Sequence, residues 1–304
     1  MRTRNRAVLR RNRDILRRSS ALLLFVLLAL IGILFGTAWR RSHPGQNTRQ
    51  LVVTFLAVGN GDCTLIQSPE GRTVLVDTGS LQAAPKVAAL LRGRNVRTVD
   101  LLLLTSPDAA SVGGVPALLG SGVRVSQIWD NSVADTGEAR RAALEAVRRR
   151  HIPSSVAGAG DTIQIGARLF VSALWPPNTG EASRRDPLVC RINYGSTSFL
   201  LEAPATAQAK RDFISQAGPQ MECTGGCTDL VLQAATQAEI SPEMLRRATP
   251  AIVVLSCGPD DPPDQATLHS LQAAGAVVWR TDTQGTITIT AGGRVSPSVT
   301  AERL

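Results

Sequence analysis

The turn that follows the apolar run Leu101–Leu104 carries the residue types whose spacing comes nearest to a chemical site. Ser106, Asp108 and Ser111 offer two hydroxyls and one carboxylate, and so few oxygen donors would hold a hard cation only weakly. Hydrolysis at a two-metal centre needs several His, Asp or Glu side chains that converge on the ions. A serine nucleophile needs a neighbouring base, and the chain's only histidines stand elsewhere in the sequence, at positions 43, 151 and 269.

Three further polar residues, Asn60, Asp62 and Asp77, also follow apolar runs that are typical of strands. If these strand ends meet at one edge, the three residues form a residual polar pocket with Asp108. Such a pocket would hold one cation weakly. The alternative interpretation, which we prefer, is that these side chains cap turns and hydrogen-bond loops.

Apolar runs bounded by Gly, Pro, Asn and Asp predict the strands that would position these groups. The predicted strands cover residues 51–58, 63–67, 73–76, 100–104, 169–173, 188–193, 198–201, 230–232, 251–255, 276–279 and 286–290. Helical spacing of apolar residues predicts helices over 84–93 and 137–150. Strands interspersed with helices predict an α+β fold of two packed sheets flanked by helices, rather than a doubly wound parallel sheet.

Several of these strand ends match short signatures of one protein family in order and spacing. The matching segments are Leu56–Asp62, Leu75–Gly79, Thr105–Gly114, Asp186–Val189, Phe199–Pro204, Ala235–Ala238 and Arg280–Ile287. Together they resemble the β-lactamase-like domain of the competence protein ComEC family over residues 51–293. The resemblance implies a four-layer αββα metallo-β-lactamase-like sandwich.

The resemblance also implies where metal ligands would lie. The family turn reads Ser-His-Pro-x-x-Asp-His-x-Gly-Gly, a bridging Asp follows a later strand, and a further His-His pair follows another. In this chain the corresponding turn and strand ends hold Ser106, Asp108, Ala110, Ser111, Pro204, and Ala235 or Thr236. Hydroxyl groups are poor zinc ligands beside imidazole and thiolate. We therefore expect a degenerate site with no catalytic residue, no metal and no cofactor.

The N-terminal part of the chain predicts a membrane anchor. Ala21–Trp39 contains no charged residue, and about 20 apolar residues at 1.5 Å per residue cross a hydrocarbon layer of roughly 30 Å. Arginines are concentrated before this segment, which by the positive-inside rule puts the N-terminus in the cytoplasm and the main domain outside. The alternative is a signal peptide cleaved near the small residues Gly36 and Ala38.

The formal net charge of +9 comes entirely from the N-terminal tail. Residues 1–41 hold ten Arg and one Asp, so the remaining 23 basic and 23 acidic residues cancel. The folded part therefore lacks the basic footprint of a nucleic-acid-binding domain, and its charge does not support nucleic acid as a partner. The basic tail is expected to be attracted to an anionic lipid surface. Arginines 140, 141 and 148–150 of the predicted helix 137–150 are explained by the helix dipole, which favours cations at a C-terminus.

The chain has five cysteines, so at least one stays unpaired within a monomer. Cys223 and Cys227 flank a short Gly-containing loop and are the candidate disulfide of an exported domain. Cys63, Cys190 and Cys257 are better interpreted as buried apolar residues of strands.

The predicted organisation is a basic cytoplasmic tail (1–20), a transmembrane helix (21–39), a polar linker (40–50), the metallo-β-lactamase-like domain (51–293) and a C-terminal tail (294–304). This organisation predicts a single-pass protein of the cell membrane with its main domain on the extracytoplasmic side.

The expected function is a catalytically inactive, ComEC-like binding or scaffolding domain with a link to DNA uptake or the cell envelope. One alternative is a metal-dependent hydrolase or nuclease with a rearranged site around Asp108, Asp77 and Asp62, which would use zinc or manganese. Another is an accessory subunit of a polytopic membrane protein. We therefore favour a binding protein over an enzyme.

Overall fold

The computed structural model of the chain describes residues 50–130, 137–177, 187–202, 207–222, 229–235, 240–292 and 296–303. Residues Arg49–Leu304 form one compact unit. Within the described part of the chain, no helix has the length and apolar character needed to span a bilayer. The predicted anchor, Ala21–Trp39, lies outside the described residues, so it stays a prediction.

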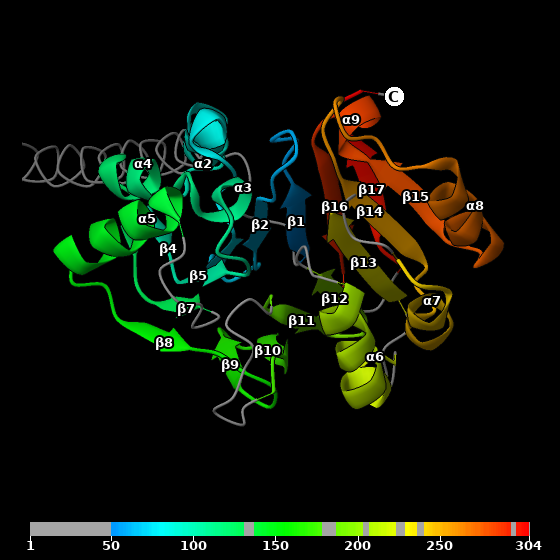
Figure 1. Cartoon of the computed structure of the whole chain (residues 1–304). Helices are drawn as coiled ribbons and strands as arrows, with labels where there is room; N and C mark the ends of the chain where they lie inside the picture. The colour runs from blue at the N-terminus through cyan, green and yellow to red at the C-terminus, as the bar shows by residue number, and fades with distance from the viewer. Residues whose placement is uncertain are drawn as a thin grey trace, which may run out of the picture. The chain divides into compact units, whose positions relative to one another are not determined.

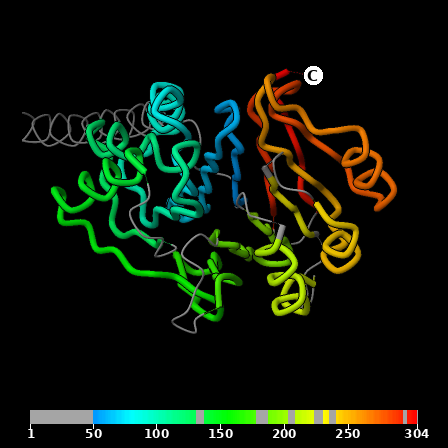
Figure 2. Tube along the Cα trace, in the orientation of Figure 1, coloured from blue at the N-terminus to red at the C-terminus, as the bar shows by residue number. Residues whose placement is uncertain are grey.

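Two mixed β-sheets form the middle of this unit (Figure 1). In spatial order, the first sheet consists of β17 (Ser298–Ala301), β16 (Ile287–Ala291), β1 (Leu51–Phe55), β2 (Thr64–Gln67), β3 (Thr73–Val76), β5 (Leu101–Leu104), β7 (Ile128–Asp130) and β8 (Ser154–Val156). The second consists of β15 (Val277–Arg280), β14 (Ile252–Ser256), β13 (Asp229–Ala235), β12 (Thr197–Glu202), β11 (Val189–Tyr194), β10 (Leu169–Trp175) and β9 (Thr162–Ile165). Two short strands, β4 (Thr98–Val99) and β6 (Arg124–Val125), pair with each other in a separate two-stranded sheet. The red end of the trace in Figure 2 returns beside the blue first strand, because β16 pairs with β1.

Helices cover the outer face of each sheet. The helices on the first sheet are α2 (Ala84–Gly93), α3 (Ala109–Val112), α4 (Val115–Gly120) and α5 (Glu138–Arg149). Those on the second are α6 (Ala207–Met221), α7 (Pro242–Ala248) and α8 (Gln265–Ala273). The short helices η1 (Leu81–Ala83) and α9 (Thr281–Gln284) belong to connections at strand ends. The layers are therefore α, β, β, α, as the sequence predicts.

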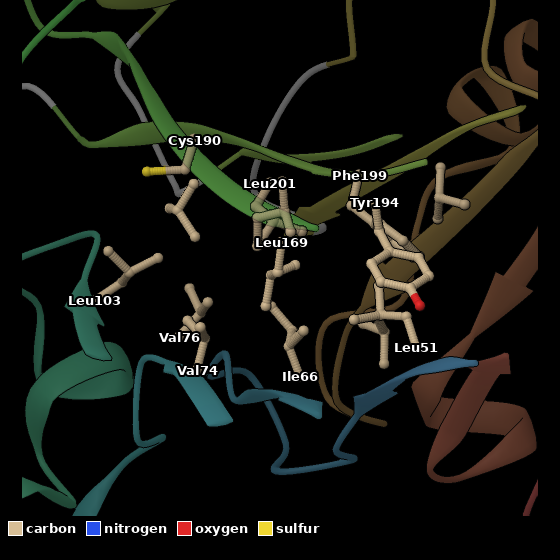
Figure 3. Close-up of a cluster of buried hydrophobic side chains, with 14 of the residues drawn as sticks. Leu51, Ile66, Val74, Val76, Leu103, Leu169, Cys190, Tyr194, Phe199 and Leu201 are labelled. Carbon is tan, nitrogen blue, oxygen red and sulfur yellow. The ribbon is translucent and has the colours of Figure 1, made fainter. Parts of the chain in front are cut away.

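The largest apolar cluster lies between the two sheets (Figure 3). Burial on both faces explains why the sequence of strand β5 is an unbroken run of leucines. Leu101 and Leu103 point into the cluster between the sheets, whereas Leu102 and Leu104 point to the helices on the outer face. A strand that is buried on both faces favours apolar residues at every position, because successive side chains alternate between the faces.

The structure adds elements that the sequence patterns did not predict. Strand β8 has exposed side chains throughout, so it lacks the apolar alternation by which a strand is identified in a sequence. Strand β17 lies within the segment interpreted as a C-terminal tail and pairs with β16. The predicted first strand, 51–58, ends earlier, at Phe55, where the chain turns towards Asp62.

Replacing Phe199 tests the packing between the sheets. Phe199 on β12 is 0% exposed, whereas Phe170 on β10 is 38% exposed. We expect Phe199→Ala to lower the free energy of unfolding by about 3–5 kcal/mol, because it leaves a cavity in a closely packed core. Phe170→Ala, the matched control, should cost less than about 1 kcal/mol. Urea unfolding followed by tryptophan fluorescence measures both, and equal losses would contradict this account of the core.

Candidate functional site

The turn after β5 is held by the carboxylate of Asp77, which follows β3. Strands β3 and β5 are parallel neighbours, so their ends meet. One oxygen of Asp77 accepts a hydrogen bond from the Thr105 backbone N–H at 2.9 Å, and the other accepts one from the Thr105 hydroxyl. The backbone N–H of Asp77 donates to the carbonyl oxygen of Leu103 at 2.8 Å. Both oxygens of this buried acid are therefore engaged within the protein.

A second buried acid, Asp62, links the two sheets. The side-chain amide of Gln233 on β13 donates to the Asp62 carboxylate at 2.8 Å and to the hydroxyl of Ser256 at 3.2 Å. Asp62 belongs to the connection between β1 and β2 of the first sheet, whereas Gln233 and Ser256 belong to the second. The contact therefore joins the sheets at the edge where these strands end.

Burial changes the protonation of both acids. It raises the pKa of Asp77 to about 8, although hydrogen bonds from Thr105 lower it and the charge of Asp62 raises it further. Burial also raises the pKa of Asp62 to about 6, against the lowering effect of hydrogen bonds with Ser256 and Gln233. Near neutral pH, Asp77 is therefore largely an uncharged acid. Metal binding by Asp77 would therefore require the release of this proton.

The two serines of the turn are buried, whereas Asp108 is exposed. The Ser106 hydroxyl donates to the Asp108 carboxylate at 2.8 Å. Within the described part of the chain, the Ser111 hydroxyl has no hydrogen-bond partner, whereas the Ser111 carbonyl oxygen accepts a hydrogen bond from the Thr78 backbone N–H at 2.8 Å. The carbonyl oxygen of Ala110 lies 2.3 Å from the point where a Cβ on Gly61 would be. The backbone of the turn is thus packed directly against the loop before β2.

The structure brings together only part of the predicted polar pocket. Asp62 and Asp77 lie close enough for their charges to interact, but Asp108 and Asn60 are exposed. Asn60 instead packs against Gly258: a Cβ added to Gly258 would lie 2.1 Å from the side-chain oxygen of Asn60. In the described ranges, no three His, Cys, Asp or Glu residues are grouped so that they could hold a metal ion.

Several predicted positions fall outside what the structure describes. Pro204 and Thr236 lie outside the described residues, as do Cys223 and Cys227. Ala235 is the last residue of β13, and its side chain is not among those described. The remaining histidines of the folded unit are exposed and separate from the turn: His151 follows α5, and His269 lies on α8.

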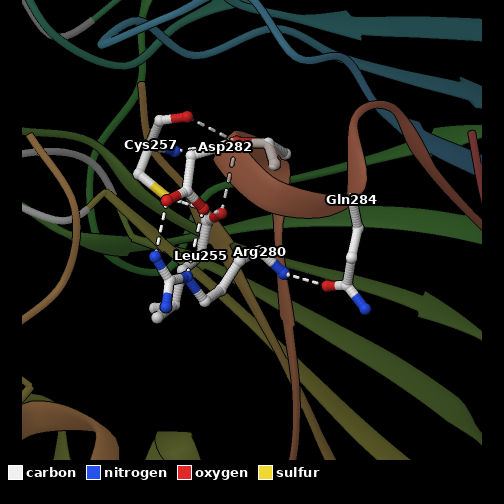
Figure 4. Close-up of polar contacts among 6 residues, drawn as sticks. Leu255, Cys257, Arg280, Asp282 and Gln284 are labelled. Atoms are coloured by element: carbon white, nitrogen blue, oxygen red, sulfur yellow. Dashed lines mark hydrogen bonds and ion pairs between the residues drawn. The ribbon is translucent and has the colours of Figure 1, made fainter. Parts of the chain in front are cut away.

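The three other cysteines are buried free thiols: Cys63, Cys190 and Cys257. The thiol of Cys257 donates to Asp282 at 3.1 Å, and Asp282 in turn pairs with Arg280 at 2.5 Å (Figure 4). Burial raises the pKa of Cys257 to about 11. Since the thiolate is the reactive and metal-binding form of cysteine, this group has a structural role at the ends of β14 and β15.

Sequence patterns alone did not identify the partners that hold these acids. Gln233 interrupts the apolar run of β13, and this single polar position in a buried strand was a usable signal. Arg140 was grouped with the arginines that the dipole explains at the C-terminal end of the helix, but it lies in the first turn of α5 and is buried. Its helical spacing with Ala143 and Val147, both buried, would have placed it on the inner face.

A cleft of about 690 Å³ opens beside the turn. Its lining residues come from η1, from the turn, from the start of α4 and from the first turns of α5. Asp108 and Arg140 both belong to this lining. The cleft is the place in the described part of the chain where a charged ligand would meet both an exposed carboxylate and a buried guanidinium.

Comparisons with known proteins identify the fold. No protein-family model matches the chain, and no curated protein matches it. Among solved structures, the metallo-β-lactamase fold protein YhfI from Bacillus subtilis matches with a TM-score of 0.52 at 13% sequence identity, over 78% of this chain and 98% of that one. At this identity the likeness shows the fold alone, which is a metallo-β-lactamase fold.

Two other solved structures match less closely. A diphosphatase from the PhnP family has a TM-score of 0.46 and 14% identity, over 79% of this chain and 99% of that one. Zinc-bound PqqB from Methylobacterium extorquens has a TM-score of 0.44 and 12% identity, over 76% and 97%. The resemblance to the ComEC family stays a prediction.

The raised pKa of Asp77 predicts how stability depends on pH. Between about pH 4 and 8 the folded chain holds a proton on Asp77 that the unfolded chain has released, so stability falls as pH rises through this range. We expect a loss on the order of a few kcal/mol between pH 5 and pH 9. Asp77→Asn should reduce this loss, because the amide is uncharged and can still bond to Thr105.

Urea unfolding at a series of pH values measures the effect. Asp108→Asn, a substitution at an exposed carboxylate, is the matched control. We expect this variant to keep the decline in stability of the native chain. If Asp77→Asn retains the full decline between pH 5 and pH 9, the account of this buried acid is wrong.

Proposed function

We propose that the chain is a non-catalytic, ComEC-like member of the metallo-β-lactamase fold that acts as a binding or scaffolding domain. Ala21–Trp39 holds it in the cell membrane, with the folded domain on the extracytoplasmic side. The signatures Leu56–Asp62, Leu75–Gly79 and Thr105–Gly114 support the kinship. The proposal includes a role next to a polytopic membrane protein in DNA uptake or the cell envelope.

One observation carries the proposal: the acids that remain near the turn are used to hold the fold. Asp77 has both oxygens bonded to Thr105. Asp62 is bonded to Gln233. The neighbouring turn positions hold Ser106 and Ser111. These residues do not fit a two-metal centre, which needs several ionised or imidazole donors around the ions.

The competing function is a metal-dependent hydrolase or nuclease that uses zinc or manganese around Asp108, Asp77 and Asp62. The exposed carboxylate of Asp108 in the cleft is the observation in its favour. Against it, the other two carboxyl groups are buried and bonded to side chains of the fold. The hydrolase or nuclease function is therefore the less supported of the two.

Metal content distinguishes the two functions. We expect the full-length chain, purified in detergent without chelator, to contain far less than one zinc, manganese or iron ion per molecule by elemental mass spectrometry. Asp108→Ala and the exposed control Asp260→Ala should behave alike in hydrolase and nuclease assays. One or two ions per chain, together with chelator-sensitive hydrolysis that only Asp108→Ala abolishes, would overturn the proposal.

Membrane attachment has a separate test. We expect the full-length chain to stay in the membrane pellet after washing at alkaline pH, because about 20 apolar residues suffice for a span. A variant that lacks residues 21–39 should move to the supernatant. Release of a shortened wild-type chain would support signal cleavage near Ala38 instead and would contradict the anchor.

A further inference from the structure

Arg140 is a buried cation with unused hydrogen-bonding capacity. Its side chain is 2% exposed, and its Nη2 atom pairs with the Asp130 carboxylate at 2.5 Å. Among the residues that the structure describes, its Nε and Nη1 atoms have no hydrogen-bond partner. Buried polar groups almost always have partners, and an unsatisfied one that carries charge is costly. These two nitrogens therefore point to a group that binds there.

The surroundings of Arg140 supply further donors. Arg140 is the third residue of α5, no side chain caps this helix, and Gly137 to Arg140 all line the cleft. The first N–H groups of a helix have no partner within the helix, and they form the positive end of its dipole. Arg140 lines the cleft together with these first residues of the helix, so a ligand in the cleft would meet both.

The walls of the cleft decide what kind of ligand fits. Leu81 is 61% exposed and forms one apolar wall, to which Pro107 and Pro116 also contribute. Clefts of roughly 300–1,000 Å³ suit small organic molecules, and this one has about 690 Å³. A ligand with a short apolar segment would cover Leu81.

The charges on the rim exclude a simple anion. Arg140 is already paired with Asp130, and the other charged lining residues, Asp108 and Glu138, are both exposed carboxylates. A bare phosphate or carboxylate would meet two negative groups before it reached Arg140. A molecule that carries a cation as well as an anion satisfies both ends of the cleft.

We propose that this cleft binds a small zwitterion, with its carboxylate on Arg140 and the start of α5 and its amine towards Asp108 and Glu138. A short apolar spacer would lie against Leu81. The proposal gives a ligand class to the binding role proposed above and in that respect rests on it. The two can fail separately, because metal content does not depend on occupation of the cleft.

Matched probes test the charge requirement. The full-length chain in detergent is titrated calorimetrically with 6-aminohexanoate, with hexanoate, which lacks the amine, and with hexylamine, which lacks the carboxylate. We expect 6-aminohexanoate to bind at least tenfold more tightly than either. Equal affinities, or no saturable binding of 6-aminohexanoate, would overturn the proposal while leaving the metal-free, non-catalytic assignment intact.

Substitutions then locate the site. Arg140→Lys keeps a cation for Asp130 but removes the free guanidinium donors, and it should weaken 6-aminohexanoate binding at least tenfold. Arg149→Lys, an exposed arginine of the same helix, is its control. Asp108→Asn should weaken binding of 6-aminohexanoate but not of hexanoate. Unchanged affinity in both test variants would refute the site.

A variant at the surface covers the case in which Arg140→Lys does not fold. Ala142 lines the cleft and is exposed, so Ala142→Trp should fill the cleft without disturbing the core. Ala273→Trp places the same side chain at an exposed position of α8 and should leave binding unchanged. If 6-aminohexanoate binds Ala142→Trp as tightly as the native chain, it binds elsewhere and the proposal is wrong.

Discussion

Two acids held out of water, Asp62 and Asp77, determine how the strand ends of this protein are joined. Asp77 ties the end of β3 to the start of the turn after β5 through Thr105. Asp62 reaches across to Gln233 on the other sheet. Removing either acid would leave its buried partners unsatisfied, which costs more than the hydrogen bond itself contributes. The turn, the cleft beside it and the contact between the sheets all depend on these two groups.

Close backbone contacts fix the path of the chain at the turn, whatever side chains the turn carries. The loop before β2 approaches the turn so closely at Gly61 that a Cβ there would lie 2.3 Å from the Ala110 carbonyl oxygen. Gly114 is similarly placed, with Thr78 O at 2.5 Å from its added Cβ. Glycine is required at such positions whatever the neighbouring side chains do. Side chains in the turn are free of that constraint and can change without changing the path of the chain.

The sequence predicted features that rest on local interactions better than features that join distant parts of the chain. The leucines of β5, the helical spacing of α2 and α5 and the turn glycines are local signals, and they gave the layers of the fold. The bond between Asp62 and Gln233 joins residues 171 positions apart, so no local pattern contains it. Arg140 was misinterpreted because the helix dipole favours cations at a C-terminus, whereas Arg140 is the third residue of α5 and shares its buried face with Ala143. The chemistry of the site was therefore harder to predict than its position.

The return of the last strands to the first has a consequence for the order of folding. Val53 on β1 faces Ile289 on β16, so the middle of the first sheet joins two distant parts of the chain. Until residues 287–291 have been synthesised, one edge of β1 has no partner. An open apolar edge invites pairing with other chains, and contacts between distant segments form slowly because a long loop must close first. A ribosome that stalls before this point would leave an aggregation-prone chain, so pairing of the last strands is the step that completes the first sheet of the nascent protein.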